Sequence, residues 1–159
     1  MRVLGIDPGI ATTGYGIVET KNNILKVVDY NCITTLPELP IGSRLKSIYD
    51  GMLKVIEKFK PDHVAVEELF FAKNLKTAIS VSEARGVIIL AATKKGILEI
   101  YEYTPLQVKL ALVGYGRAQK NQIQQMVKIL LNLNTIPKPD DIADALAVAI
   151  CHINYKGLS

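Results

Sequence analysis

The order of strand-like and helix-like segments is the feature that most restricts the fold of this chain. Three strand-like segments come first, and short apolar strands then alternate with helices before a run of helices closes the chain. The strands are predicted at residues 2–7, 14–20, 24–35, 63–67 and 97–103, and the helices at 41–59, 74–95, 105–112, 118–132 and 140–154. An antiparallel hairpin followed by strand–helix crossovers indicates an α/β fold, a mixed five-stranded sheet with helices on both faces.

Length and composition are those of one folded domain. At 159 residues the chain has room for a single domain, which we expect to span residues 1–159. With 49% apolar and 21% charged residues it can bury a core, which excludes long disorder. No apolar run approaches the ~18–20 residues of a membrane span, and Asp7 comes too early for a signal-peptide core. Cys32 and Cys151 belong to no metal-binding motif, so we expect a cytoplasmic protein with two reduced thiols and no membrane partner.

Positive charge is concentrated in the middle of the chain. Residues 1–68 carry 8 basic and 9 acidic side chains, whereas residues 69–138 carry 10 basic and 3 acidic ones. No acidic residue occurs between positions 103 and 139. The basic side chains of that stretch are Lys109, Arg117, Lys120, Lys128 and Lys138. Such a segment is either a solvated face or a phosphate-binding surface, and composition alone leaves both open.

Acidic side chains end two of the predicted strands and begin the last predicted helix. If the first and fourth strands are parallel neighbours, Asp7 and Glu67 emerge at one edge of the sheet, where open α/β sheets place ligands. Asp144 lies inside the helix among apolar residues, on the face of Asp141, and is costly to bury unless a cation meets it. A turn-forming role for Asp7 and plain exposure of Glu67 remain open alternatives.

Three acidic positions in a chain with a basic middle predict a site for a hard cation. Carboxylates are the ligands that Mg²⁺ and Mn²⁺ prefer, and two such ions about 3.5–4 Å apart can stabilise the attacking and leaving oxygens of a phosphoryl displacement. The predicted reaction class is therefore a nuclease or a phosphotransferase. His63 and His152 are too few and too scattered in the sequence to predict zinc.

Several segments match one known family in their order along the chain. They are LGIDPG (residues 4–9) with TGYG (13–16), VEELFFAKN (66–74) with EARG (83–86), QVKLALVG (107–114) with Lys120 and QIQ (122–124), and DIADALA (141–147). Together they resemble the RuvC-type Holliday-junction resolvases (crossover junction endodeoxyribonucleases) of the RNase H-like superfamily. The combination is specific, whereas GIDPG alone occurs at the start of many RNase H-like and actin-like proteins.

This resemblance implies an RNase H-like fold, a homodimer and a metal site built from four carboxylates. The catalytic and metal-binding residues that it implies are Asp7, Glu67, Asp141 and Asp144. We expect Mg²⁺ as the cofactor, with two ions per active site and Mn²⁺ as a substitute. The DNA-binding residues that we expect are Phe70, Lys73, Lys109, Arg117 and Lys120, with Phe71 packed rather than bound to DNA.

The same resemblance implies an activity and its partners. Members of this family cut two opposed strands of a four-way DNA junction symmetrically during homologous recombination and DNA repair, and they work with a branch-migration motor. Two sites are needed for such cutting, so we expect an isologous homodimer. The interface is predicted on the helix at 74–95, through Leu75, Ala78, Ile79, Val87, Leu90 and Ala91.

Two other functions remain open at this point. One is an RNase H-like nuclease that acts on RNA precursors, which the Lys109–Lys120 segment and the Phe70 region disfavour. The other is a non-catalytic nucleic-acid-binding module, which the intact set of acids disfavours. An actin-like ATPase needs two such domains, and the chain is long enough for one.

Overall fold

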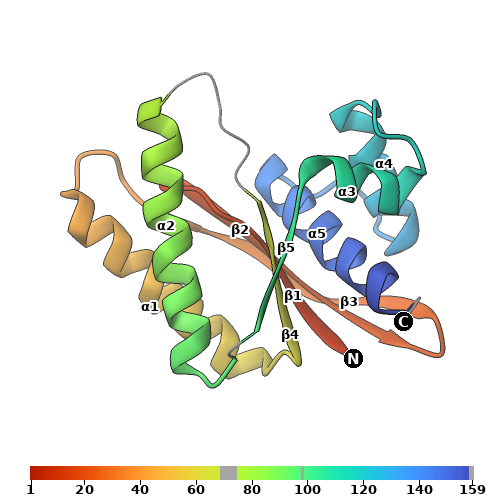
Figure 1. Cartoon of the computed structure of the whole chain (residues 1–159), viewed down its shortest axis with the longest axis horizontal. Helices are drawn as coiled ribbons and strands as arrows, with labels where there is room; N and C mark the ends of the chain where they lie inside the picture. Colours follow the sequence, from red (N-terminus) through yellow and green to blue (C-terminus); the bar gives the residue numbers. More distant parts are fainter. Residues whose placement is uncertain (69–74, 98, 158–159) are drawn as a thin grey trace.

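A mixed β-sheet with helices on both faces forms the centre of the protein (Figure 1). The computed structural model describes residues 1–68, 75–97 and 99–157. The strands in these ranges are β1 (Arg2–Asp7), β2 (Thr12–Lys21), β3 (Ile24–Thr34), β4 (His63–Glu67) and β5 (Ile100–Tyr103). The helices are α1 (Ile41–Phe59), α2 (Leu75–Lys94), α3 (Pro105–Val113), α4 (Lys120–Leu130) and α5 (Asp140–Gly157). The predicted order of elements is confirmed.

The strand order β3-β2-β1-β4-β5 places β1 and β4 side by side in the middle of the sheet. β1 pairs antiparallel with β2 and parallel with β4, and β4 pairs parallel with β5. Ile6 is the partner of Val66, so the strand ends at Asp7 and Glu67 lie next to each other. The predicted shared edge is therefore confirmed.

Alternating side chains of the central strands divide the core into two layers. Val3 and Ala65 pack on the side of α3, α4 and α5, whereas Leu4, Ile6 and Val66 pack on the side of α1 and α2. Successive side chains of a strand point to opposite faces, so a strand that is apolar at every position must be covered on both. This accounts for the helical layer on each side of the sheet in Figure 1.

Glycines let α5 lie directly on the backbone of the sheet. A Cβ atom on Gly5 would collide with the carbonyl oxygen of Ala145, and one on Gly14 with the carbonyl oxygen of Asp141. A Cβ on Gly16 would overlap the side chain of Leu146. The main chains of β1, β2 and α5 are therefore in contact, and this contact brings the start of α5 to the sheet edge that carries Asp7.

The ends of several elements differ from the predicted ones by a few residues. The strand predicted from Ile97 begins at Ile100, because the Ile97 N–H donates to the Ala92 carbonyl 3.1 Å away and closes the end of α2. β2 begins at Thr12 rather than at residue 14, since Thr12 still pairs with β3. The helix predicted at 118–132 is shorter (Lys120–Leu130), and α5 continues to Gly157.

Ala91 was wrongly predicted to belong to a dimer interface on the helix that is now α2. Ala91 is buried within the chain, in the core layer shared by α1 and α2, and therefore presents no surface. Ile79 and Leu90 are 53% and 58% exposed, so α2 does carry an outward apolar face.

Both cysteines are free thiols in the described ranges, and Cys151 is buried. Across the same ranges, the helices are all too short or too polar to cross a membrane.

Candidate active site

Two carboxyl groups face each other at the shared edge of β1 and β4. Asp7 and Glu67 end neighbouring parallel strands, and their side chains are hydrogen-bonded to each other. A hydrogen bond between two carboxyl groups requires one proton, and burial followed by the nearby charge of Glu67 raises the pKa of Asp7 to about 8. The pair thus shares a proton near neutral pH.

The charge of the remaining acids adds to this crowding. Asp144 and Asp141 both raise the pKa of Asp7 further, after burial and Glu67. Burial and then the charge of Asp144 raise the pKa of Glu67, against the opposing effects of the Asp7 bond and of Lys120. The site therefore collects more negative charge than it stabilises when all its acids are ionised.

Lys120 is the cation that meets Asp144. The Lys120 Nζ lies 2.8 Å from Asp144 Oδ2 and 3.5 Å from Asp140 Oδ2. Burial raises the pKa of Asp144 even though Lys120 opposes this. The sequence predicted that an acid inside this apolar helix needs a cation, and in the free protein the first residue of α4 supplies it.

Asp141 lies where α5 meets β2. Its carbonyl oxygen sits over Gly14, which pairs with Asp7 across the hairpin, so Asp141 belongs to the same cluster. The acids are nevertheless not arranged as a ready chelate: within residues 1–68, 75–97 and 99–157, no three His, Cys, Asp or Glu side chains are grouped to hold a metal ion. Asp144 instead bonds to Lys120.

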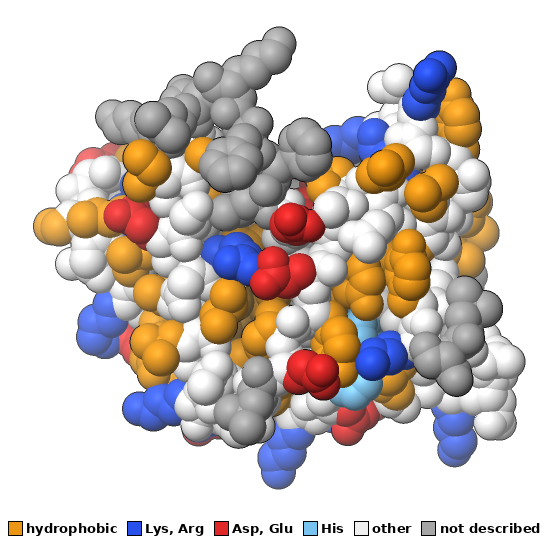
Figure 2. Space-filling model, viewed as in Figure 1, with side chains coloured by type: hydrophobic (Ala, Val, Ile, Leu, Met, Phe, Trp, Pro, Cys, Tyr) orange, Lys and Arg blue, Asp and Glu red, His pale blue; other side chains and the backbone are white. Residues whose placement is uncertain are grey.

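A cavity of about 190 Å³ opens beside these acids. It is lined by Glu67, Pro105, Val108, Lys109, Lys120, Ile123, Asp144 and Ala147. Lys109 and Lys120 thus share this cavity with Glu67 and Asp144. Arg117 is exposed in the loop before α4 and does not line the cavity. On the face of the molecule shown in Figure 2, acidic and basic side chains lie next to each other near the centre.

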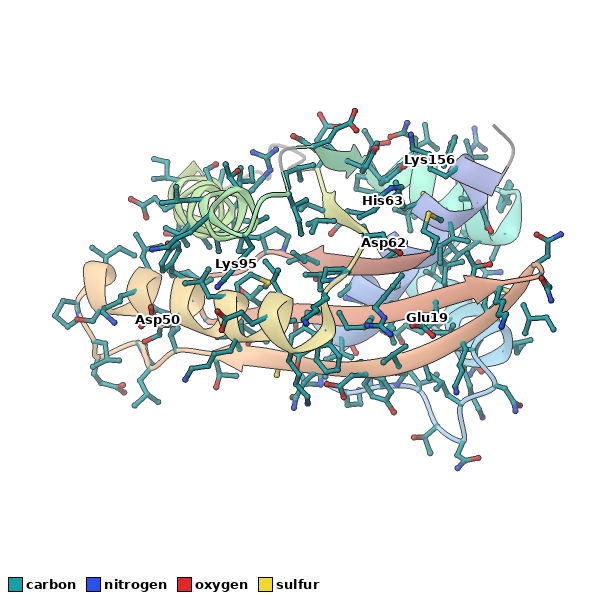
Figure 3. The ribbon with its side chains drawn as sticks, turned by 90° about the horizontal axis from the view of Figure 1, so that it is seen from below. Glu19, Asp50, Asp62, His63, Lys95 and Lys156 are labelled. Atoms are coloured by element: carbon teal, nitrogen blue, oxygen red, sulfur yellow. The ribbon has the colours of Figure 1, made fainter. Side chains whose placement is uncertain are left out.

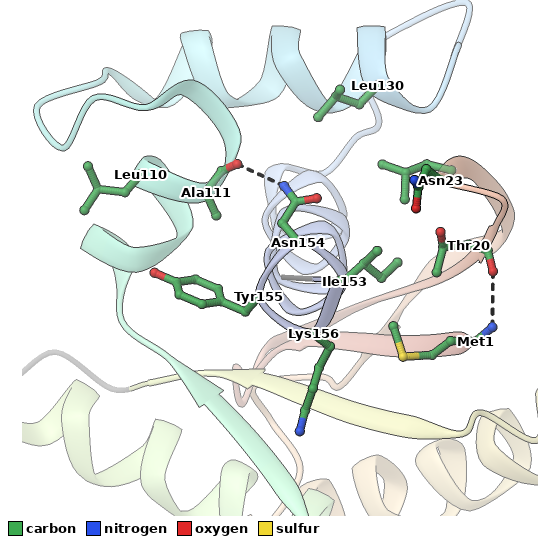
Figure 4. A pocket seen from close by; sticks show the side chains of 12 residues that line it. Met1, Thr20, Asn23, Leu110, Ala111, Leu130, Ile153, Asn154, Tyr155 and Lys156 are labelled. Atoms are coloured by element: carbon green, nitrogen blue, oxygen red, sulfur yellow. Dashed lines mark hydrogen bonds between the residues drawn. The ribbon is translucent and has the colours of Figure 1, made fainter. Parts of the chain in front are cut away.

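A larger cavity of about 820 Å³ lies elsewhere, at the other end of α5 (Figure 4). Met1, Leu110, Ile153 and Tyr155 are among its lining residues, and among the residues that the structure describes no Asp or Glu lines it.

The structure does not describe all of the sequence candidates. Phe70, Phe71 and Lys73 lie outside the described residues. Glu68 is exposed, and its N–H donates to the Tyr103 carbonyl 2.8 Å away. It therefore differs from its neighbour Glu67, which lies in the cluster.

Sequence reasoning missed one group of polar side chains. His63 and His152 are 89 residues apart in the chain, yet their rings are hydrogen-bonded. No short-range pattern could have paired them, because the contact depends on β4 and α5 packing together.

The comparisons with known proteins identify the family of the chain. The family model "Crossover junction endodeoxyribonuclease RuvC" matches residues 3–152. A relative of that name from Caldanaerobacter subterraneus subsp. tengcongensis is 60% identical over 158 residues, covering 99% of this chain and 95% of its own length. A relative from Halothermothrix orenii is 58% identical over 159 residues, covering 100% of this chain and 96% of its own.

Solved structures extend the agreement to the fold. The structure of Thermus thermophilus RuvC in complex with Holliday junction substrate matches with a TM-score of 0.95 and 38% identity, covering 99% of this chain and 96% of that one. The RNase H-like fold expected from the sequence is thereby confirmed. The endonuclease activity expected from the sequence is the activity for which the family is named. With the family model matched from residue 3 to residue 152, the chain belongs to the RuvC family of crossover junction endodeoxyribonucleases.

Proposed function

We propose that this protein resolves four-way (Holliday) DNA junctions by paired, symmetric phosphodiester cleavage during recombination and DNA repair, with residues 1–159 acting as one nuclease domain. Family membership supports the reaction. The observation that carries the proposal is the cluster at the sheet edge, where Asp7 is hydrogen-bonded to Glu67, and Asp144 lines the same cavity as Glu67 and two lysines.

The chemistry of these residues fits a hard divalent cation. Burial and mutual repulsion raise the pKa of Asp7 to about 8, so the cluster lacks a positive charge that would let all its acids ionise. Asp7, Glu67, Asp141 and Asp144 are the oxygen donors that would hold Mg²⁺, at two ions per site, or Mn²⁺ in its place. When bound, such ions supply Lewis acidity next to the scissile phosphate.

The basic residues have a separate part in this proposal. Lys109 and Lys120 line the cavity beside Glu67 and bind the DNA phosphates that flank the cut. Arg117, exposed nearby, extends this basic surface. Phe70 and Lys73 are kept as junction contacts on the strength of the family motif, which places them directly after the Glu67 strand.

Symmetric cleavage requires a second copy of the chain. The outward apolar side chains Ile79 and Leu90 of α2 support a homodimer through this helix, which would direct two equal sites at opposed strands. Cooperation with a branch-migration motor is part of the same proposal.

The test is incubation with a four-way junction, a linear duplex and a structured RNA, each with and without Mg²⁺. The expected result is paired nicks in the junction that require Mg²⁺ and are absent from the other two substrates. Preferred cutting of the RNA would favour an RNA-processing nuclease. Junction binding without any cutting would favour a non-catalytic module.

A matched pair of variants ties the activity to this site. Glu67→Gln should abolish cleavage and leave junction binding largely intact, because it removes a charge of the cluster and no DNA contact. Glu68→Gln makes the same change on the exposed neighbour and should retain substantial activity. The reverse result would assign the metal site to the wrong glutamate.

A further inference from the structure

A buried hydrogen-bonded chain joins α5 to two strands of the sheet, away from the acids. The two ring nitrogens of His152 are both engaged: Nε2 lies 2.8 Å from Nδ1 of His63 in β4, and Nδ1 lies 2.8 Å from the hydroxyl of Tyr103 in β5. His152 is fully buried, and the Tyr101 ring packs 4.4 Å from its centroid. His63 is the first residue of β4 and is labelled in Figure 3.

A neutral His152 ring can make both bonds. One of its nitrogens carries a proton and donates it, and the other nitrogen accepts a hydrogen bond. Burial, followed by the charges of His63 and Lys156, lowers the pKa of His152 to about 4, and burial raises that of Tyr103 to about 12. Both groups are thus neutral at ordinary pH, and both bonds persist.

These bonds add direction to a contact that is otherwise made by close packing. Where α5 crosses β1 and β2, its main chain lies on Gly5 and Gly14, and this contact sets the distance between the helix and the sheet. Asn154, two residues further on, bonds to the Ala111 carbonyl of α3 and not to a strand. His152 therefore supplies two directional bonds between the helix and the sheet.

The helix that His152 holds is the one that carries two of the acids. Asp141 and His152 are about three turns apart and so lie on the same face of α5. The strand that His63 begins is the one that Glu67 ends. A rotation or shift of α5 relative to β4 would therefore move Asp141 and Asp144 relative to Glu67.

We propose that His152 is a positioning residue for cleavage: its bonds to His63 and Tyr103 fix the rotation of α5 and its position along the sheet, and thereby the placement of Asp141 and Asp144 against Asp7 and Glu67. This inference rests on the proposed function in assigning the four acids to one active site. It assigns no contact with DNA to His152, which is fully buried.

The experiment compares two Tyr→Phe variants of the same strand. Tyr103→Phe removes the hydroxyl that bonds His152, whereas Tyr101→Phe removes one that bonds the exposed Glu99. Tyr103→Phe is expected to lower kcat on a four-way junction about ten- to a hundred-fold, with unchanged junction affinity in EDTA, because small misplacement of catalytic groups costs rate rather than binding. Tyr101→Phe is expected to behave as the wild type.

His152→Leu tests the same idea without a polar group. The variant removes both bonds and leaves the buried Tyr103 hydroxyl without its His152 partner, so a lower melting temperature is expected. The distinguishing result is a strongly reduced kcat of the folded fraction, measured well below that melting temperature. His152→Asn and His152→Gln each retain one of the two bonds and should fall between. A purely structural role would move the melting temperature and leave kcat of the folded fraction unchanged, and that result would overturn the proposal.

A readout that needs no cleavage separates this inference from the proposed function. The backbone amide resonances of Asp141 and Asp144 in the metal-free protein should shift in Tyr103→Phe and not in Tyr101→Phe. The ¹⁵N resonances of the His152 ring should report a neutral ring with a proton on one nitrogen. If the wild type cuts no junction while these shifts occur, the proposed function fails and the positioning role stands. If the amides of Asp141 and Asp144 do not respond, the positioning role is wrong even in an active enzyme.

Discussion

Replacing Asp7 by asparagine should stabilise the metal-free protein while it abolishes cleavage. Burial and the neighbouring acids raise the pKa of Asp7 from 3.8 to about 8, so the folded state disfavours its charged form. The amide of asparagine can donate a hydrogen bond to Glu67 as protonated Asp7 does, but it never ionises. The variant therefore keeps the bond and loses the repulsion.

The size of the effect follows from the two pKa values. Between about pH 4 and pH 8 the unfolded chain has an ionised Asp7 and the folded protein a protonated one, so stability falls as pH rises through this window. The limit is about 1.4 kcal/mol for each pH unit, which sums to about 6 kcal/mol above pH 8. Burial of the amide offsets part of this gain, so we expect Asp7→Asn to be more stable by about 2–4 kcal/mol near pH 8.

The titration of His152 changes the stability of the protein with pH in the opposite direction, so its contribution must be separated from that of Asp7. Its lowered pKa of about 4, against 6.5 in the unfolded chain, removes stability as pH falls below about 6.5. Wild type and Asp7→Asn both contain His152, so the difference between their unfolding free energies isolates Asp7.

The assay is urea unfolding of both proteins in EDTA at several pH values between about 6.5 and 8.5. Asp50→Asn, on the outer side of α1 beside Lys46, serves as the control acid. The difference between Asp7→Asn and wild type should grow with pH and level off above about pH 8, and Mg²⁺ should then stabilise the wild type alone. A difference that does not change with pH would refute the claim that Asp7 is a crowded, buried acid.

Three further outcomes follow from the structure. Lys109→Ala should reduce turnover and should lower the slope of log Kd against log salt concentration by about one charge. The slope is measured by titrating junction binding at several salt concentrations, and an unchanged slope would mean that Lys109 is a solvated side chain that binds no phosphate. Gly14→Ala should cost about 1–3 kcal/mol in unfolding free energy and most of the activity, because its Cβ would displace Asp141; wild-type kinetics would contradict this. Leu90→Lys should give a folded monomer by sedimentation, since Leu90 is 58% exposed; a stable dimer would place the interface elsewhere.

Local patterns were sufficient for the elements and for part of the site. The apolar runs that end at Asp7 and Glu67 predicted both strands, and their parallel pairing brought the two acids together as expected. The need of Asp144 for a cation was also predictable from its apolar neighbours. That the cation is Lys120 was not, because the pairing depends on how α4 packs on α5.

The failures share the same physical origin. Ala91 reads as an equal member of the apolar surface of α2, and only the position of α1 decides that it is buried. His63 and His152 read as isolated residues because the contact spans 89 positions. The strand predicted from Ile97 starts late because a backbone bond back to Ala92 competes for its first residue.

The glycines under α5 also set how tightly the geometry of this site is held. A spacing kept by side chains changes whenever a neighbour repacks, because side chains have several rotamers. Where Gly5 and Gly14 meet the carbonyl groups of α5, the spacing is instead the contact distance between two main chains, which is the same for any sequence. The core around Leu146 can therefore accumulate substitutions while the helix stays at one height above the sheet. The helix cannot move closer to the sheet, because the two main chains are already in contact there. The distance of Asp141 and Asp144 from the sheet is therefore set by the backbone and not by side-chain packing.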